Sequence, residues 1–553
     1  MDVSGLAGRI PSLAGRIPGN PVGRVADGAF LIRVLANAGA FAPVRPDRAG
    51  RMLLTYVRWG RNPATALTLS SIGHPDERFL ADELGDLSFA EGESRANSLA
   101  RALAQRGVRQ GDGIALMARN HRWFVDVALA SAKLGCNTIF LNTMFSGPQL
   151  ADVVEREAPR TLVYDQEFSG LLEGMGTDVR RYVAWHEGDD ELADGSIADL
   201  IESTRDDPVD PPDETPGFVI LTSGTTGTPR GAQRRPPSGL APLAALIDAI
   251  PYRSRERMMI AAPLFHSWGF LHLIIGLTLS NSIVLRRKFD PQGTLDAVER
   301  SDAQTLAVVP VMLQRILALG DEALEAFSLP SLRVTAVSGS ALPGELATEW
   351  MDRYGDSVYN LYGSTEVAYA SVASPADLRR APGTAGRPPH GTTVRIVDER
   401  GEDVAPGRTG RIFVGNEMAF EGYTGGGGKE ALEELFSSGD VGHFDDDGLL
   451  FIDGRDDEMI VSGGENVFPR EIEDLLAGHP AVREVAVIGV DDEEFGQRLK
   501  AFVVVTESGE LSEHDAKAYV KANLAGYKSP REIVFCDSLP RNATGKILKR
   551  ELA

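Results

Sequence analysis

Short apolar segments alternate with longer segments of helical spacing from about residue 85 towards the C-terminus. Gly113 to Met117, Thr161 to Tyr164 and Thr305 to Val309 have the length and apolar character of strands, whereas Ser94 to Arg106 and Trp123 to Leu134 have helical spacing. Strands that alternate with helices are typical of βαβ units. We therefore predict an α/β protein.

The length of 553 residues predicts more than one domain. The strongest candidate boundary lies at Gly454 to Asp457. Beyond it we expect a compact α+β unit, with helices at 469–477 and 513–525 and strands at 484–490, 501–505 and 532–536. The expected organisation is an N-terminal basic extension (1–62), a large N-terminal α/β domain of several subdomains (63–454) and a small C-terminal domain (455–553).

Charge and composition restrict the class of protein. The net charge of −23 argues against nucleic acid as a partner. The first residues lack the apolar region of a signal peptide, and no uninterrupted apolar run reaches the roughly 18 residues of a transmembrane helix. Cys136 and Cys536 have no metal-ligand spacing, so we expect two buried reduced thiols. The expected location is the cytoplasm.

Residues 1–62 differ from the rest of the chain, with nine arginines and three aspartates. The segments Phe30 to Leu35 and Met52 to Trp59 mix apolar residues with arginine. One interpretation is a helix that lies on an anionic membrane surface, which would add peripheral contact with the inner membrane. The other, which we favour, is a segment packed on the main domain with exposed arginines.

The apolar run Phe218 to Leu221 is followed by a loop rich in glycine and hydroxyl side chains that ends at Arg230 and Gly231. Successive free N–H groups in such a loop can form an anion site, and glycine lets the backbone approach a ligand. The loop lacks the Gly-Lys-Ser/Thr of a P-loop. By composition alone it is also typical of a plain turn.

The order of residues in this loop resembles the phosphate-binding loop of the adenylate-forming superfamily, which includes acyl-CoA synthetases, luciferases and peptide-synthetase adenylation domains. The resemblance runs from about residue 85 to the C-terminus and implies a mobile C-terminal domain. It implies a phosphate-binding set of Thr222, Ser223, Gly224, Thr225, Thr226, Gly227 and Arg230. The family usually has Lys where this chain has Arg230.

Three further segments match the family in the expected order. The first is Ala262 to Gly269, in which His266 and Trp268 would flank the acyl pocket; a lone His in such a place is otherwise typical of a protein core. The second is Val337 to Pro343, and the third is Tyr362 to Glu366. The resemblance implies that adenine lies against Gly339, Ser340 and Ala341 and stacks on Tyr362.

Carboxylates and hydroxyls in these motifs account for the remaining groups of ATP. The resemblance implies that Thr365 bonds the α-phosphate and that Glu366 binds Mg²⁺, which needs only one or two carboxylates beside phosphate oxygens and waters. Asp440 would hold the ribose, assisted by Arg455. Relatives commonly have Thr where this chain has Ser438.

The C-terminal motifs carry the reaction in this family. Lys546 falls on the catalytic lysine, whose ammonium bridges two anions, the acid and the phosphate. Asp457 falls on the hinge about which the C-terminal domain turns. The segment from Ser462 to Val467 falls on a loop that then lines the CoA tunnel through Ser462, Gly463 and Gly464.

The resemblance implies an AMP-forming acid–thiol ligase that uses ATP, Mg²⁺ and coenzyme A. Acetate-activating relatives have Trp where this chain has Gly363, so we expect an open acyl pocket and a medium- or long-chain fatty acid, as in bacterial fatty-acid–CoA ligases. Two alternatives stay open: an aryl-acid–CoA ligase and a fatty-acyl-AMP ligase that loads a carrier protein. The sequence leaves chain length and oligomeric state undecided.

Overall fold

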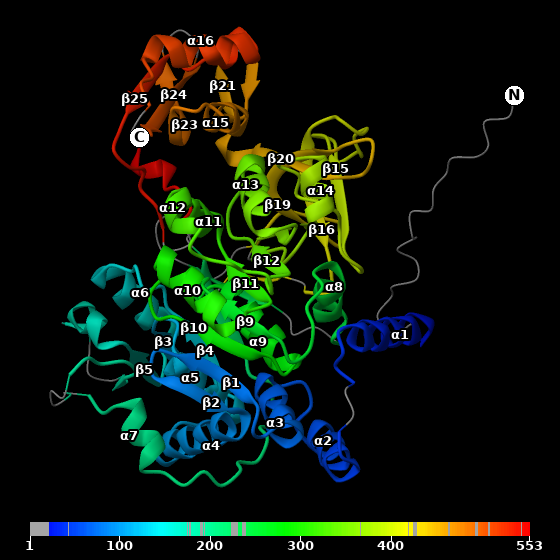
Figure 1. Ribbon diagram of the computed structural model, residues 1–553, viewed down its shortest axis with the longest axis vertical. Coiled ribbons are helices and arrows are strands. Elements are labelled where there is room, and N and C mark those ends of the chain that lie inside the picture. Colours follow the sequence, from blue (N-terminus) through cyan, green and yellow to red (C-terminus); the bar gives the residue numbers. More distant parts are fainter. Residues whose placement is uncertain are drawn as a thin grey trace, which may run out of the picture.

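The protein is a mixed α/β molecule with a large N-terminal part and a smaller C-terminal part, as predicted (Figure 1). The computed structural model describes residues 21–41, 44–173, 175, 179–188, 192, 194–222, 230–234, 239–364, 366–418, 420–423, 428–462, 465–492, 496–506, 509–542 and 545–552.

Two largely parallel sheets form the centre of the large part. The eight-stranded sheet has the order β14-β13-β12-β11-β9-β10-β1-β2, with antiparallel strands only at its two edges. Its strands are Arg78–Asp82 (β1), Gly85–Ser88 (β2), Arg257–Ile260 (β9), Ser282–Leu285 (β10), Thr305–Val308 (β11), Val334–Val337 (β12), Val358–Tyr362 (β13) and Ser371–Ala373 (β14). Several of its strands are buried throughout, as expected for a sheet covered on both faces.

The seven-stranded sheet has the order β17-β8-β7-β4-β3-β5-β6 and is parallel from β7 to β6. Its strands are Gly113–Met117 (β3), Asn137–Phe140 (β4), Thr161–Tyr164 (β5), Arg180–Val183 (β6), Phe218–Thr222 (β7), Arg230–Arg234 (β8) and Phe420–Tyr423 (β17). In the β7–β8 hairpin Thr222 pairs with Arg230, so the two described ends of the predicted phosphate loop are adjacent in the sheet.

Two smaller sheets follow. One contains Thr393–Val397 (β15), Gly410–Gly415 (β16), Ala431–Leu432 (β18), Leu435–Phe444 (β19) and Leu450–Arg455 (β20); the other contains Ile460–Ser462 (β21), Glu465–Val467 (β22), Val482–Asp492 (β23), Gly496–Val505 (β24) and Glu532–Phe535 (β25). A short 3-10 helix, Asp456–Glu458, connects β20 to β21. The predicted hinge residue Asp457 therefore lies between the last strand of one sheet and the first strand of the next.

Helices pack around the sheets (Figure 1). They are Pro21–Asn37 (α1), Pro46–Trp59 (α2), Pro63–Gly73 (α3), Phe89–Gln105 (α4), Arg122–Leu134 (α5), Gly147–Glu157 (α6), Ile197–Glu202 (α7), Ala241–Ala249 (α8), Ser267–Thr278 (α9), Pro291–Ser301 (α10), Pro310–Leu317 (α11), Asp321–Leu324 (α12), Gly344–Tyr354 (α13), Pro375–Arg380 (α14), Pro469–Ala477 (α15) and Glu513–Asn523 (α16). Three more 3-10 helices are Gln166–Leu172, Gly526–Lys528 and Lys549–Glu551.

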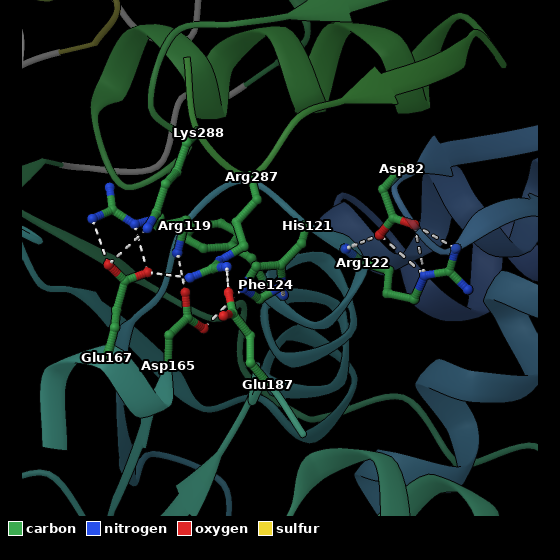
Figure 2. Close-up of polar contacts among 10 residues, drawn as sticks. All are labelled: Asp82, Arg119, His121, Arg122, Phe124, Asp165, Glu167, Glu187, Arg287 and Lys288. Carbon is green, nitrogen blue, oxygen red and sulfur yellow. Dashed lines mark hydrogen bonds and ion pairs between the residues drawn. The ribbon is translucent and has the colours of Figure 1, made fainter. Parts of the chain in front are cut away.

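Ion pairs join the two large sheets. Arg287 and Lys288 follow β10 and contact Glu167, which also receives two 2.8 Å hydrogen bonds from Arg119 beyond β3 (Figure 2). Hydrogen bonding to Arg119 lowers the pKa of Glu167 to about 2. The side chains of Arg119 and Glu167 are partly exposed. A second contact between the two sheets joins Arg122 of α5 to Asp82 of β1, and its side chains are almost fully buried. These contacts hold the sheets in one arrangement around the site between them.

The expectation of two buried thiols is correct for only one of the two cysteines. Cys136 is buried, and burial raises the pKa of its thiol to about 12, but Cys536 is only partly buried.

Within the described residues, none of the helices combines the length and the apolar character needed to cross a bilayer.

Candidate active site

Most of the predicted site residues line a single cavity of about 1670 Å³. Those that line it are His266, Trp268, Gly339, Ser340, Ala341, Tyr362, Gly363, Glu366, Asp440, Arg455, Asp457 and Lys546. Thr365, Gly463, Gly464 and the loop residues Ser223, Gly224, Thr225, Thr226 and Gly227 lie outside the described residues, and Thr222, Arg230 and Ser462 are described only as members of their strands.

The predicted adenine wall begins where β12 ends. The hydroxyl of Ser338 donates to the carbonyl of Leu361, which ties the end of β12 to β13 at 2.8 Å. Gly339 has φ of +99°, a left-handed conformation that favours glycine. Small residues thus leave backbone exposed beside Tyr362, which is the arrangement that a flat base requires.

Tyr362 and Asp440 are joined by a short hydrogen bond. The phenol donates to Oδ2 of the carboxylate at 2.5 Å. Burial raises the pKa of Tyr362 well above its usual value, and the neighbouring Asp440 raises it further. Tyr362 is therefore a neutral donor at physiological pH, and it holds Asp440 in one orientation.

Arg455 approaches the other oxygen of Asp440. The two residues are cross-strand partners in the β19–β20 ladder, and Nη1 lies 3.4 Å from Oδ1. Burial raises the pKa of Asp440, while Tyr362 and Arg455 oppose that rise. Arg455 also donates to both oxygens of Asp457 at 3.0 and 3.2 Å. The predicted ribose carboxylate and the predicted hinge are thus linked through one guanidinium.

Lys546 lies directly before Ile547, which forms an isolated β-bridge with Arg541. The N–H of Lys546 donates to Oδ1 of Asn542 at 2.8 Å. Lys546 is exposed in the cavity and exerts an electrostatic effect on Asp440. The cation and the nucleotide-side carboxylate are therefore on the same side of the cavity, although they are far apart in sequence.

Gly545 explains how this segment comes so close to the large domain. It has φ of +78°, and a Cβ at this position would lie 2.1 Å from Cγ1 of Val311 in α11. Close by, the amide of Gln314 in α11 donates to the carbonyl of Arg483 at 3.0 Å. The C-terminal part is thus docked on α11 with Lys546 directed into the cavity.

Glu366 provides the carboxylate expected for a metal. It lines the cavity next to Tyr362 and Gly363. The described residues contain no cluster of three or more side chains that could hold a metal by themselves. A single carboxylate fits Mg²⁺ that is held mainly by phosphate oxygens and water, and does not fit a protein-enclosed metal site.

The predicted acyl end is lined by α9. His266 caps this helix, and burial lowers the pKa of its imidazole to about 4, so the ring is neutral at pH 7. Its Nε2 is buried without a hydrogen-bond partner among the described residues. An unsatisfied buried nitrogen at a cavity wall is well placed to meet a polar group of a ligand.

Trp268 is fixed by a chain of hydrogen bonds. Its indole N–H donates to the carbonyl of Val308 at 2.9 Å. Nδ1 of His272 donates to the carbonyl of Trp268 at 2.9 Å, so Nε2 of His272 accepts from the hydroxyl of Tyr252, also at 2.9 Å. Burial lowers the pKa of His272 to about 4 and keeps it neutral. Trp268 is therefore a rigid part of the cavity wall.

Comparison with known proteins assigns the family. Residues 70–424 match the AMP-binding enzyme family, and residues 471–546 match the C-terminal domain of AMP-binding enzymes. The chain belongs to the AMP-binding enzyme family. It is an ATP-dependent AMP-forming acid–CoA ligase, and adenylate-forming enzymes of this family bind ATP and Mg²⁺ and generally use CoA.

Individual relatives differ in the acid that their names state. The indoleacetate–CoA ligase of Aromatoleum aromaticum is 33% identical over 482 residues, which cover 84% of this chain and 92% of that one. The fatty acid–acyl-carrier-protein ligase ScoC of Streptomyces coeruleorubidus is 30% identical over 478 residues, covering 84% and 91%. The solved structure of the anthranilate CoA ligase AuaEII with anthranoyl-AMP is 27% identical, with a TM-score of 0.80 over 89% of this chain and 96% of that one.

The backbone around position 363 explains why this member of the family has glycine there, which the sequence did not reveal. A Cβ there would lie 2.2 Å from the carbonyl oxygen of Ala368 and 2.8 Å from Cα of Tyr369. Backbone crowding therefore requires glycine whatever the acid. The absence of a side chain at Gly363 is weaker support for a large acyl pocket than the sequence comparison implied.

Two cavity-related residues were missed from the sequence. Lys429 lines the cavity near Gly439 and acts electrostatically on Asp457. The sequence could have indicated Lys429, because lysine is rare in this chain, which has only nine. Buried Asn120 donates to the carbonyls of Ile260 and Ala262 and accepts from the N–H of Leu264, so it shapes the segment before His266. No local pattern indicated Asn120, because its partners are more than 100 residues away.

Proposed function

We propose that this ligase activates a medium- or long-chain fatty acid, first to acyl-AMP and then to acyl-CoA. The observation that carries the proposal is the extent of the cavity. Its lining includes His266, residues along α9, and Ala66, Leu69 and Ser70 of α3. Apolar side chains of α8 and α9 form most of this part of the wall, and Ser70, His74 and Ser280 add polar groups beside α3. An aryl acid would leave most of this length empty.

The dimensions suit an extended alkyl chain. Cavity-lining residues occur along the whole of α9, from Ser267 to Thr278, and a helix of 12 residues is about 18 Å long. The hydrocarbon core of a bilayer is roughly 30 Å thick, so the acyl chains of one leaflet span about 15 Å. The carboxyl group would lie near His266 and the methyl end near α3.

In the first step of the proposed reaction, a carboxylate oxygen of the acid attacks the α-phosphorus of ATP. The bond to the bridging oxygen breaks, and pyrophosphate leaves with the electron pair. Lys546 neutralises repulsion between the two anions and stabilises the developing charge, and Thr365 bonds the α-phosphate. The 222–230 segment holds the β- and γ-phosphates, and Asp440 accepts the ribose hydroxyls.

Glu366 would hold Mg²⁺ together with oxygens of the phosphates. When bound, the ion supplies positive charge to the polyphosphate. The residues of the chain provide the orientation: Tyr362 and the wall from Gly339 to Ala341 receive adenine, and Arg455 keeps Asp440 in place.

In the second step the C-terminal part turns about Asp457, which withdraws Lys546 and brings Ser462, Gly463 and Gly464 to the site. The sulfur of CoA attacks the acyl carbonyl carbon, the thiol proton is lost, and the bond to AMP breaks. Such rearrangements often limit turnover. The electrostatic effect of Lys546 on Asp440 supports assigning this arrangement to the first step.

Aryl-acid–CoA ligation and transfer to a carrier protein are the competing activities. Relatives named for indoleacetate and anthranilate favour an aryl acid, and ScoC is named for transfer of a fatty acid to a carrier protein. The length of the cavity favours a fatty acid over an aryl acid. We further propose peripheral contact between the basic N-terminal extension and the inner membrane surface.

A panel of acids tests the substrate. The wild-type enzyme is given ATP, Mg²⁺ and CoA with fatty acids of increasing length, indoleacetate or anthranilate, and AMP and thioester are measured together. We expect the highest kcat/KM with a medium- or long-chain fatty acid. Lys546→Ala is the matched control: it should lose adenylation while it still converts supplied acyl-AMP to acyl-CoA. Preference for an aryl acid, or AMP without thioester, would contradict the proposal.

A further inference from the structure

Helix α2 has an apolar stripe that faces away from the protein. Leu53, Leu54 and Val57 are 64%, 71% and 73% exposed, and no residue of α2 is fully buried. On a helix these three positions fall within one face, because residues three and four apart are neighbours. Figure 1 shows α2 at the periphery of the molecule, beside α3.

An adjacent side of the same helix lines the cavity, and its Tyr56 is 42% exposed. Met52 and Tyr56 are one turn apart and form part of its wall, together with Ala40 and Val44 of the preceding segment. The apolar stripe and the wall of the acid channel are therefore two faces of one helix. The cavity lining also includes Gly60, Arg61 and Asn62, which connect α2 to α3.

The charges around this face are mixed but include unneutralised arginine: Arg58 pairs with Asp210 and Arg45 pairs with Asp47, whereas Arg48 donates to a backbone carbonyl and keeps its charge. Arg45, Arg48, Arg51, Arg58 and Arg61 are opposed within residues 44–62 only by Asp47. Arg51 is exposed on α2, one turn before Leu54, and Arg58, two turns after Arg51, is ion-paired with Asp210. An apolar stripe flanked by arginines is the pattern of a helix that lies in the headgroup region of an anionic bilayer.

We propose that α2 docks on an anionic lipid bilayer and that the fatty acid passes from the bilayer into the cavity at the end that α2 lines. The inference rests on the proposed function, because it needs a lipid-soluble acid. A bilayer fits better than a second protein copy. A stable protein interface takes about 20–30 residues on each side, whereas this stripe offers three large apolar side chains.

Vesicle sedimentation and activity test the proposal together. The variant Leu53→Ser/Leu54→Ser/Val57→Ser removes the stripe without touching cavity-lining residues. Leu84→Ser is the matched control, since Leu84 is 50% exposed on the turn between β1 and β2. We expect the triple variant to bind phosphatidylglycerol vesicles at least tenfold more weakly than the wild type and the control, and Arg51→Glu to show an intermediate loss.

Rates measured with and without vesicles separate membrane docking from catalysis. With a medium-chain acid and no vesicles, the triple variant should match the wild type; with a long-chain acid embedded in vesicles, its rate should fall at least fivefold. Equal vesicle binding by all variants, or lost binding without slower use of the embedded acid, would overturn the proposal. So would a wild-type dimer that the triple variant abolishes in sedimentation velocity. Failure of the proposed function would instead appear as no turnover of any fatty acid by the wild type without vesicles.

Discussion

Three side chains at the nucleotide end act as one unit. Tyr362 donates to one oxygen of Asp440, and Arg455 approaches the other. A buried carboxylate is costly unless it is hydrogen-bonded, and these two partners oppose part of the rise that burial causes in its pKa. We infer that Tyr362 and Arg455 favour the ionised form of Asp440 before ATP binds.

Tyr362→Phe tests this unit at the level of a single oxygen atom. The substitution removes a donor that favours the ionised form, so the pKa of Asp440 should rise further. Nucleotide binding needs the carboxylate, which is present above its pKa and lost as pH falls. We therefore expect the acidic limb of the ATP KM profile to move to higher pH, and AMP binding to weaken about tenfold, or ~1.4 kcal/mol, at neutral pH.

Tyr359→Phe is the matched control, because Tyr359 lies on the same strand but does not line the cavity. It should leave both the KM and its pH profile unchanged. A Tyr362→Phe enzyme with the wild-type profile would show that the phenol does not support Asp440.

Among the elements, the C-terminal tail is held by a partly buried network of three charged side chains. Nζ of Lys549, in the last 3-10 helix, lies 2.9 Å from carboxylates of both Glu458 and Glu473. Burial raises the pKa of Glu473, and Lys549 opposes that rise. Glu458 follows the predicted hinge and Glu473 lies on α15, so Lys549 anchors the tail that bears Lys546 to both of them.

Lys549→Met should lower the free energy of unfolding by about 1 kcal/mol, because it leaves two partly exposed carboxylates without their cation. Urea denaturation measures the loss. Adding Glu473→Gln to this variant should recover part of it, since one of the two unpaired charges is then removed. Lys521→Met, at an exposed position on α16, is the control and should change stability little. Equal stability of the Lys549 and Lys521 variants would rule out an anchoring role.

At the scale of the whole molecule, the two half-reactions require two positions of the C-terminal part. The 3-10 helix Asp456–Glu458 connects the two smaller sheets. Arg455, the last residue of the preceding strand, forms an ion pair with Asp457. Rotation of the C-terminal part at this point would either break the ion pair between Arg455 and Asp457 or move both residues together.

Asp457→Pro should spare adenylation and block thioester formation, because proline restricts φ at the proposed pivot. Pyrophosphate release and acyl-CoA yield are measured separately. Asp457→Ala is the control that removes the carboxylate but keeps a free φ, and it should retain both steps. If the two variants lose thioester formation equally, the carboxylate and not the backbone rotation is what matters.

Much of the fold could be predicted locally. The strands at 113–117 and 161–164 and the helix at 469–477 have the predicted bounds. The helix predicted to begin at Ser94 begins instead at Phe89, because Ser88 and Glu91 form a capping box that was readable in the sequence. Strands β23 and β24 are longer than predicted, since pairing continues into polar residues such as Asp491 and Gln497.

By itself, the sequence determined the family and the α/β class, since local apolar patterns and short ordered motifs carry both. Only the tertiary structure decided the partner of Tyr362, the crowding at Gly363, the contact of Asn120 with the segment before His266, and the length of the cavity. The physical reason is the same in each case. These features arise where segments that are far apart in the chain approach within a few ångströms, and no local pattern encodes the identity of such a neighbour.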